Sequence, residues 1–401
     1  MDALDGTIAR LADQCVKCGL CLPHCPTYRL ARVEAESPRG RIALMQSVAQ
    51  KQIAPSPALL MHLDQCLGCG SCERVCPSSV AYGRLLRLGR ESLRRPPGRA
   101  QRMMYALAAR PRWLRALAFA ARRAGVSRWL PGISARLLGA DSSITRAARA
   151  FPAARIAQSA PLSAPAPRSR GRVGLFLGCV ASAFDQDTHH AARRLLDALG
   201  FEVVIPSGQG CCGALAWHAG HADTAAALAT PTRQSFVEAR LDMVLVSASG
   251  CYSTLRELTF AQTAVDVREI GEFLSGQDLS SLAFRPLDAT VAVHLPCSLV
   301  NAVKAGAAVT TLLSRIPGIR LVTLPEQPRC CGAAGSYFLE HPAQADALLT
   351  EKLDQTQALS PDLLVTSNIG CRLHLESGVR QRARALPVLH PITLLARQLD
   401  A

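Results

Sequence analysis

Beyond residue 171 the apolar residues of the chain gather in short runs, with polar segments between them. The runs cover residues 173–179, 200–205, 243–251, 291–297, 318–323 and 363–371. Short apolar runs rich in β-branched residues are typical of strands that are buried on both faces. Because segments with a helical pattern separate the runs, the chain predicts strands and helices alternating around parallel or mixed α/β sheets.

The cysteines of this region repeat with the strands. They recur at offsets of 118, 119, 119 and 120 residues, which pair Cys179 with Cys297, Cys211 with Cys330, Cys212 with Cys331, and Cys251 with Cys371. A nearly constant offset predicts a duplicated Cys-Cys-Gly module, which we place at residues 171–285 and 286–401. Each cysteine follows a predicted strand end, where reactive groups of α/β sheets gather. We therefore expect each module to bring its four cysteines to one point.

A different cysteine pattern occurs twice near the N-terminus. Residues 15–26 and 66–77 both read Cys-x2-Cys-x2-Cys-x3-Cys-Pro. This spacing is that of bacterial two-cluster ferredoxins, in which three close cysteines hold one cluster and the fourth reaches the other. We expect one [4Fe-4S] cluster on Cys15, Cys18, Cys21 and Cys76, and a second on Cys66, Cys69, Cys72 and Cys25. The alternative is a pair of structural zinc sites, which do not require this spacing.

The two ferredoxin motifs are 40 residues apart, counted between Cys25 and Cys66. Apolar residues recur at steps of three and four over residues 40–49, which predicts a helix in this connector. We therefore expect residues 1–90 to form a two-cluster 4Fe-4S domain of the all-helical ferredoxin type.

The charge of the chain is uneven. The net charge is +15 over 401 residues, but residues 84–172 contain 20 arginines and only two acidic residues, Glu91 and Asp141. Residues 91–170 therefore form an arginine-rich helical segment followed by a proline- and alanine-rich linker that includes Pro152, Pro161, Pro165 and Pro167. Arginines interleaved with Trp113 and Phe119 favour an acidic lipid surface. The alternative is a docking face for partner subunits; nucleic acid is not expected, because no recognition module is present.

Cellular location is constrained by the cysteines and by hydropathy. The chain begins with an acidic segment without an apolar core, so we expect no signal peptide and place its thiols in a reducing cytosol. The longest uncharged run, residues 203–222, contains Pro206 and several glycines, which excludes a continuous membrane-spanning helix. A Gly-x-Gly-x-x-Gly match at residues 208–213 lacks the acidic residue that a dinucleotide site requires about 20 residues later.

Three roles are open for the cysteines of the Cys-Cys-Gly modules. They can bind a further iron-sulfur cluster or another metal, form thiol/disulfide redox pairs, or act as small buried residues. Four histidines are candidate proton carriers or ligands, with a structural role as the alternative: His218, His221, His294 and His390.

Taken together, the motifs resemble the family that contains the glycolate oxidase iron-sulfur subunit. Its relatives include an iron-sulfur component of anaerobic glycerol-3-phosphate dehydrogenase, lactate-utilisation iron-sulfur proteins and heterodisulfide reductase subunits. The resemblance rests on residues 15–28, 37–42, 63–77, 82–84, 330–336 and 367–371. One departure separates the chain from heterodisulfide reductase: Ala248 and Asn368 stand where its modules have a fifth cysteine.

The resemblance implies an α+β multidomain fold, with an N-terminal α-helical ferredoxin domain followed by two repeated α/β Cys-Cys-Gly modules. It also implies an electron-transfer subunit of a 2-hydroxy-acid dehydrogenase, oxidising glycolate to glyoxylate. The chain itself would not oxidise substrate. FAD would reside on flavin-binding dehydrogenase subunits, and electrons would pass through the two clusters to the quinone pool. The expected location is cytoplasmic and peripheral, on the inner face of the cell membrane.

Other substrates and functions are compatible with the same motifs. They are lactate or glycerol-3-phosphate oxidation, a heterodisulfide-reductase-like thiol/disulfide enzyme, and a cluster-bearing redox sensor.

Overall fold

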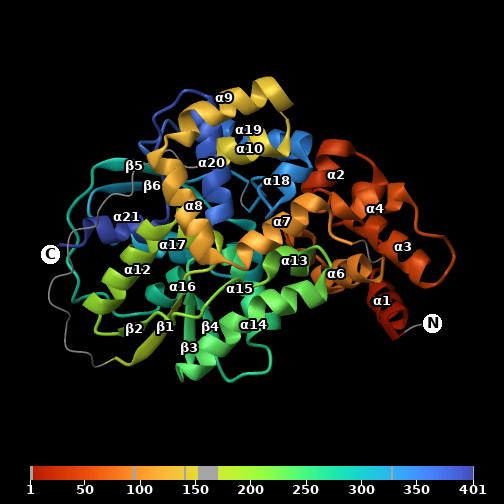
Figure 1. Cartoon of the computed structure of the whole chain (residues 1–401), viewed down its shortest axis with the longest axis horizontal. Coiled ribbons are helices and arrows are strands. Elements are labelled where there is room, and N and C mark those ends of the chain that lie inside the picture. Colours follow the sequence, from red (N-terminus) through yellow and green to blue (C-terminus); the bar gives the residue numbers. More distant parts are fainter. Residues whose placement is uncertain (1–2, 94–95, 140, 152–169, 327, 401) are drawn as a thin grey trace.

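The computed structural model describes residues 3–93, 96–139, 141–151, 170–326 and 328–400. Within these residues the chain is an α+β protein, with an N-terminal group of helices beside two small parallel sheets (Figure 1). The predicted fold class is therefore confirmed. The predicted linker prolines, Pro152, Pro161, Pro165 and Pro167, lie outside the described residues.

The N-terminal unit is entirely helical over its described residues. Its helices are α1 (Ala3–Asp13), α2 (Pro26–Ala31), α3 (Pro38–Ala49), α4 (Pro57–Asp64), α5 (Ser71–Arg74) and α6 (Tyr82–Ser92), with a 3₁₀ turn η1 (Glu34–Glu36). The helix predicted over residues 40–49 is α3, which begins two residues earlier. Helices α1, α3 and α6 pack around Ile8, Met45 and Leu85, and Cys72 belongs to the same core. The cysteine-bearing loops are thus anchored on packed helices.

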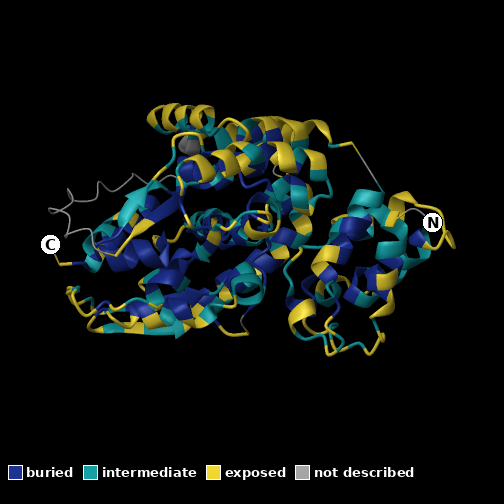
Figure 2. Cartoon of the chain, turned by 90° about the horizontal axis from the view of Figure 1, so that it is seen from below, coloured by how far each residue is buried: buried dark blue, intermediate teal, exposed yellow. Residues whose placement is uncertain are grey.

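Over its described residues, the arginine-rich segment forms four helices along the outside of the molecule. They are α7 (Arg99–Ala108), α8 (Pro111–Arg123), α9 (Val126–Leu138) and α10 (Ser143–Ala150). Helix α8 packs on the first module, where a cation–π contact joins Arg122 to Phe184, and α10 joins the second through the ion pair of Arg146 with Asp346. Much of the rest of α8 and α9 is exposed, as the outer helices in Figure 2 are.

The two modules contain four-stranded sheets of the same topology. The first has β1 (Arg172–Phe176), β2 (Glu202–Val204), β3 (Met243–Val246) and β4 (Asp266–Glu269) in the order β2-β1-β3-β4. The second has β5 (Ala289–His294), β6 (Ile319–Thr323), β7 (Leu363–Thr366) and β8 (Val388–Leu389) in the order β6-β5-β7-β8. All strand pairs are parallel. The repeat predicted from the cysteine offsets is therefore a repeat of the fold.

Burial differs between central and edge strands. The central strands β1, β3, β5 and β7 are almost wholly buried, as their apolar runs predict. Strands β2 and β6 are half exposed, so the expectation of burial on both faces is wrong for them. The reason is their position, because each lies at the edge of its sheet.

Helices complete both modules. The first contains α11 (Val180–Phe184), α12 (Gln186–Ala198), α13 (Ala214–His218), α14 (Ala222–Glu238), α15 (Ser249–Thr254), the π-helical turn η2 (Leu255–Thr259) and α16 (Ile270–Ser275). The second contains the π-helical turn η3 (Leu299–Val303), α17 (Gly306–Leu313), α18 (Tyr337–Glu340), α19 (Pro342–Leu359), α20 (Ile369–Gln381) and α21 (Pro391–Gln398). Helices α12 and α16 pack against α21 and α17, so both sheets share one hydrophobic core.

The hydropathy of the helices shows whether any of them could span a membrane. Among the described residues, none of the helices combines the length and apolar character that crossing a bilayer requires. The domain boundaries at residues 90, 170 and 285 stay a prediction.

Candidate functional site

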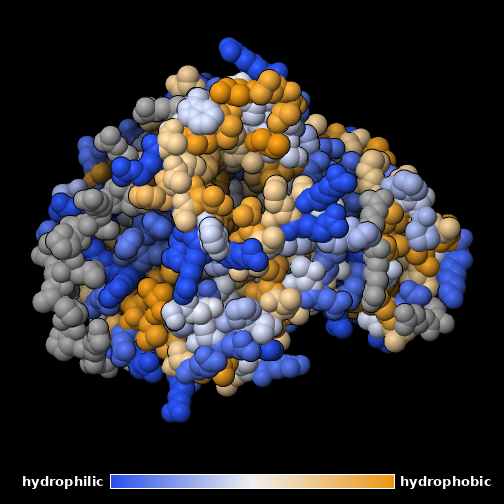
Figure 3. All heavy atoms as spheres, in the orientation of Figure 1, coloured by the Kyte–Doolittle hydropathy of each residue, from blue (hydrophilic) through white to orange (hydrophobic). Residues whose placement is uncertain are grey.

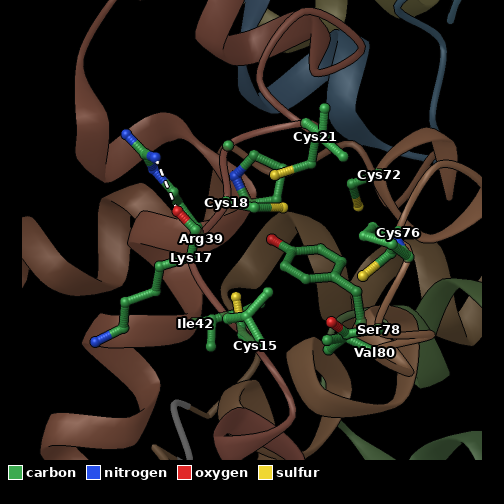
Figure 4. A pocket seen from close by; sticks show the side chains of 16 residues that line it. Cys15, Lys17, Cys18, Cys21, Arg39, Ile42, Cys72, Cys76, Ser78 and Val80 are labelled. Carbon is green, nitrogen blue, oxygen red and sulfur yellow. Dashed lines mark hydrogen bonds between the residues drawn. The ribbon is translucent and has the colours of Figure 1, made fainter.

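A cavity in the N-terminal unit is lined by cysteines of both ferredoxin motifs. Cys15, Cys18 and Cys21 come from the first motif, and Cys72 and Cys76 come from the second. Figure 4 shows their sulfur atoms around one space. The loop after α1 and the loop between α5 and α6 bring the two motifs together from distant parts of the sequence. The cavity therefore includes all four cysteines predicted for the first cluster.

The wall of this cavity is built by the residues around the start of α3. The Ser37 hydroxyl accepts a hydrogen bond from the Gly40 amide at 2.9 Å and caps the helix, and Pro38 occupies its first turn. Gly40 is required sterically, because a Cβ there would lie 2.0 Å from the Glu34 carbonyl oxygen. Arg39 pairs with Glu34 at 2.6 Å and donates to the Lys17 carbonyl at 3.1 Å. This segment therefore fixes the loop that carries the first three cysteines.

A buried ionic network supports Cys25 from the same helix. Arg41 is fully buried and forms an ion pair with Glu36. Its guanidinium also donates to the His62 carbonyl at 2.6 Å and to the Thr27 hydroxyl at 3.0 Å. Thr27 lies 3.3 Å from the Cys25 sulfur. The network thus ties α2, η1, α3 and α4 together behind Cys25.

The cysteines predicted for the second cluster lie near one another. Electrostatic interactions couple the Cys72 thiol to Cys69, Cys66 and Cys25. Burial, followed by the neighbouring Cys69, raises the pKa of Cys72 well above its ordinary value. Burial and the neighbouring Cys297 raise the pKa of Cys69 to about 12. Thiols of this kind stay protonated at neutral pH, so their ionisation requires a cation such as iron to replace the proton.

Each Cys-Cys-Gly module brings its four cysteines together. In the first module the sulfurs of Cys179 and Cys211 are 3.6 Å apart, and electrostatic interactions link Cys211 to Cys212 and Cys212 to Cys251. The second module repeats this chain through Cys297, Cys330, Cys331 and Cys371. We name these groups quartet 1 and quartet 2. Convergence at one point is thus the observed arrangement in both modules.

The glycine of each Cys-Cys-Gly motif has a steric cause. Gly213 and Gly332 have φ angles of +84° and +88°, a conformation that side chains disfavour. A Cβ at either position would also lie 2.6 Å from a carbonyl oxygen, that of Ala225 or Ala345. The tight turn at each glycine lets the two cysteines before it lie at the end of the sheet in the same module.

Quartet 2 lies against the second ferredoxin motif. The Asn301 amide donates to the Cys69 carbonyl at 2.7 Å, and electrostatic interactions couple Cys69 to Cys297 and Cys330. Tyr337 interacts electrostatically with both Cys66 and Cys330. The sequence does not reveal this contact, since Asn301 and Cys69 are 232 residues apart and neither motif signals the other.

The cavity and the cysteine groups fit iron-sulfur clusters chemically. They offer soft thiolate ligands, and a cluster is a larger body than one ion, so its ligands stand farther apart. Among the described residues, no group of three or more histidine, cysteine or acidic side chains is arranged around a single metal ion. The assignment of individual ligands stays a prediction.

The four candidate histidines differ in their surroundings. Both His390 nitrogens have backbone partners, the Ser247 carbonyl and the Ile392 amide, which makes this residue the N-cap of α21. Burial lowers the pKa of His218 to about 4 and that of His294 to about 3, so both are neutral at pH 7. Burial also lowers the pKa of His221.

Comparison with protein families supports this division of the chain. A family model described as a 4Fe-4S dicluster domain matches residues 11–80. Another, described as a cysteine-rich domain, matches residues 173–256 and 291–376. In a solved structure, a hypothetical protein from Helicobacter pylori, the fold is similar with a TM-score of 0.51. That likeness covers 90% of this chain and 73% of the other at 9% sequence identity, and it concerns the fold alone.

Curated relatives match over most of both sequences. The glycolate oxidase iron-sulfur subunit of Escherichia coli is 33% identical, over 92% of this chain and 91% of its own length. The probable glycolate oxidase iron-sulfur subunit of Bacillus subtilis is 30% identical, over 92% and 89%. Lactate utilization protein A of Bacillus cereus is 24% identical over 55% of this chain and 96% of its own length. The chain therefore belongs to the family of glycolate oxidase iron-sulfur subunits, which are iron-sulfur electron-transfer subunits of oxidoreductase complexes.

Proposed function

We propose that the protein transfers electrons in a multisubunit 2-hydroxy-acid dehydrogenase that oxidises glycolate to glyoxylate. Electrons would come from a flavin-binding subunit, cross two [4Fe-4S] clusters and leave to an acceptor at the membrane. The observation that carries the proposal is the cavity shared by Cys15, Cys18, Cys21 and Cys76, because it combines ligands of both motifs. The kinship with glycolate oxidase subunits supports the substrate.

The residues of the chain would have separate tasks in this function. The eight ferredoxin cysteines would hold the clusters, which supply one-electron chemistry when bound. Arg39 and Arg41 would keep the cysteine loops in place through their contacts with Lys17 and Glu36. Cys18 is exposed at the first site, whereas Cys69 of the second contacts Asn301 of module 2, so the second cluster would lie on the side of the modules.

The test is electron transfer in the complex reconstituted with its flavin subunits. Cys18→Ser and Cys69→Ser should each remove one cluster signal from the reduced-state paramagnetic resonance spectrum. Both variants should also abolish glycolate-dependent dye reduction at the iron-sulfur subunit, while the flavin subunit still binds glycolate. Val33→Ala is the control, since Val33 is 48% exposed and does not line the cavity.

Substrate identity and the electron-carrying role are separable in this assay. If D-lactate or glycerol-3-phosphate supports dye reduction and glycolate does not, the substrate assignment is wrong. The electron-transfer role of the chain then still stands. Unchanged electron transfer in both cysteine variants would refute the role itself.

The exposed side of α8 and α9 supports an acceptor at the membrane. It presents large apolar side chains at Trp113, Leu117, Phe119, Trp129, Ile133 and Leu137. Exposed Arg112, Arg123 and Arg136 lie on the same two helices. Figure 3 shows hydrophobic residues gathering where Figure 1 places α9. Arginines with interleaved aromatic side chains suit anionic lipid, at about 1 kcal/mol per basic residue near the surface.

Vesicle sedimentation tests this surface. The purified chain should sediment with vesicles of phosphatidylglycerol and phosphatidylcholine, and Trp113→Ser/Phe119→Ser should reduce the bound fraction. Val237→Ser, at an exposed apolar position on α14, should leave it unchanged. Equal binding by all three proteins would contradict the lipid role and favour a docking face for partner subunits.

A further inference from the structure

The two Cys-Cys-Gly modules share a fold but differ in the residues buried behind their cysteine pairs. The backbone turns at Gly213 and Gly332 face Ala225 and Ala345, which sets an offset of 120 residues between α14 and α19. With this offset Lys352 of module 2 corresponds to Thr232 of module 1. Both side chains are buried, at 1% and 0% exposure. A cation in one module therefore replaces a neutral hydroxyl in the other.

Lys352 lies beside quartet 2. Electrostatic interactions link its ammonium group to Cys330, Cys331 and His294. Burial lowers its pKa to about 8, so the amine still carries most of its positive charge at pH 7. In module 1 the Thr232 hydroxyl donates instead to the Cys211 carbonyl at 3.0 Å and accepts from the Gly210 amide. Thr232 thus completes a local backbone network and brings no charge to quartet 1.

The strand ends show the same asymmetry. In β5 and β7 of module 2, His294 and Thr366 hydrogen-bond to each other at 2.9 Å. The corresponding positions of β1 and β3 are Phe176 and Val246, which belong to an apolar cluster with Cys212. Module 2 therefore has polar side chains at the sheet end where module 1 has hydrocarbon.

Module 2 also contains buried polar atoms that lack a hydrogen-bond partner within the described part of the chain. His294 is 1% exposed, and its Nε2 has no such partner among those residues. Tyr337 is 4% exposed, and within the same described set its hydroxyl likewise has none. Tyr337 interacts electrostatically with Cys330 of quartet 2. Buried polar atoms cost free energy when they stay unpaired, so a group that accepts or coordinates at this place would relieve that cost.

We propose that module 2 alone binds an additional iron-sulfur group, held by quartet 2, with Lys352 as the positioning residue that offsets its negative charge. A group ligated by four thiolates is anionic, and burying an anion without a counter-charge is costly. Lys352 supplies that counter-charge in module 2, whereas the corresponding position of module 1 is the neutral Thr232. Quartet 1 is then a structural cluster of protonated thiols. This inference rests on the proposed function, because the additional group extends the cluster pair across the contact between Cys69 and Asn301.

Iron and acid-labile sulfide analysis of the anaerobically purified full chain tests the proposal. Two [4Fe-4S] clusters account for about eight iron atoms, so the native chain should contain more than about eight. Cys330→Ser/Cys331→Ser should lower the content to about eight and keep both ferredoxin signals in the paramagnetic resonance spectrum. The matched variant Cys211→Ser/Cys212→Ser should retain the native iron content.

Lys352 provides a second test that leaves every cysteine in place. Lys352→Thr installs the residue of module 1 and should lose the iron beyond that of the two ferredoxin clusters, or shift the midpoint potential of the additional signal downward. Lys352→Arg keeps the charge and should preserve both properties.

Each outcome decides between the two proposals. A native chain with about eight iron atoms overturns the additional site and leaves the proposed function intact. Equal iron loss in the two cysteine-pair variants, or a Lys352→Thr variant with native iron content and potential, overturns the asymmetry. A native chain without iron would instead refute the proposed function.

Discussion

Removing the Arg41 guanidinium should open the N-terminal helical unit. Arg41→Met deletes the ion pair with Glu36 together with the hydrogen bonds to Thr27 and to the His62 carbonyl. Burial opposes a charge on Arg41, yet the neighbouring groups at Cys66, Tyr82 and Glu36 hold its pKa above the ordinary arginine value. Its loss removes one partner of the Glu36 carboxylate, which is 3% exposed and also contacts His62 Nδ1 at 2.5 Å.

The magnitude follows from the burial of the pair. Breaking a buried ion pair by removing one partner costs about 3–5 kcal/mol. We assign this loss to the free energy of the local opening that exposes the amides of α3. Because about 1.4 kcal/mol is a factor of ten, amide exchange in α3 should accelerate by about a hundredfold to a few thousandfold. Hydrogen exchange read by mass spectrometry gives this rate for peptides of α3, with peptides of β5 as the internal reference.

Two further variants make the experiment decisive. Arg10→Met removes an exposed arginine that donates to the Thr7 hydroxyl at 3.4 Å, and should change exchange by no more than a few-fold. Glu36→Gln/Arg41→Met removes both charges and should lose less protection than Arg41→Met alone. Exchange in α3 of Arg41→Met within about threefold of the native rate would refute the idea that this network anchors the cysteine loops.

Two remaining predictions concern stability. Gly332→Ala should lower the melting temperature by the equivalent of about 1–3 kcal/mol, because of its φ of +88° and the contact with the Ala345 carbonyl. Gly132→Ala, inside α9 and with open space at the Cβ position, should not lower it, and equal melting of the two variants in circular dichroism would contradict the steric explanation. Burial raises the pKa of Glu269 to about 8, so the folded state binds its proton more tightly than the unfolded chain does. The free energy of unfolding should therefore fall as the pH rises from about 4.5 to 8 in the native chain, and fall less in Glu269→Gln. Urea titrations measure it at each pH. Parallel pH profiles of the two proteins would rule out this role of Glu269.

Sequence alone predicts the parts of the fold that depend on local pattern. The apolar runs place β1, β3, β5 and β7, and the cysteine offsets give the repeated topology. Strand β4 escapes prediction because Asp266–Glu269 contains three charged residues and a single apolar one, and β8 because it has only two residues. The helix α3 follows from its apolar spacing, although its true start depends on the Ser37 cap.

The candidate site likewise contains residues that the sequence predicts and residues that it does not. The ferredoxin spacing identifies the cysteines that line the observed cavity, since the cysteines of each motif are close together in the sequence. Arg41 could not be identified, because an arginine next to a glycine looks like any exposed charge until its burial is known. Lys352 and Asn301 were missed for another reason: their significance comes from contacts with residues far away in the chain, with Asn301 and Cys69 as the clearest case.

The proposed electron path depends on cluster ligation that crosses between the two motifs, and paramagnetic resonance of anaerobically reduced Cys76→Ser tests it most directly. With crossed ligation, this variant should lose the signal that Cys18→Ser also removes and keep the signal that Cys69→Ser removes. Loss of the Cys69 signal instead would mean that each motif holds its own cluster. A colourless native chain with zinc in place of iron would contradict cluster binding altogether.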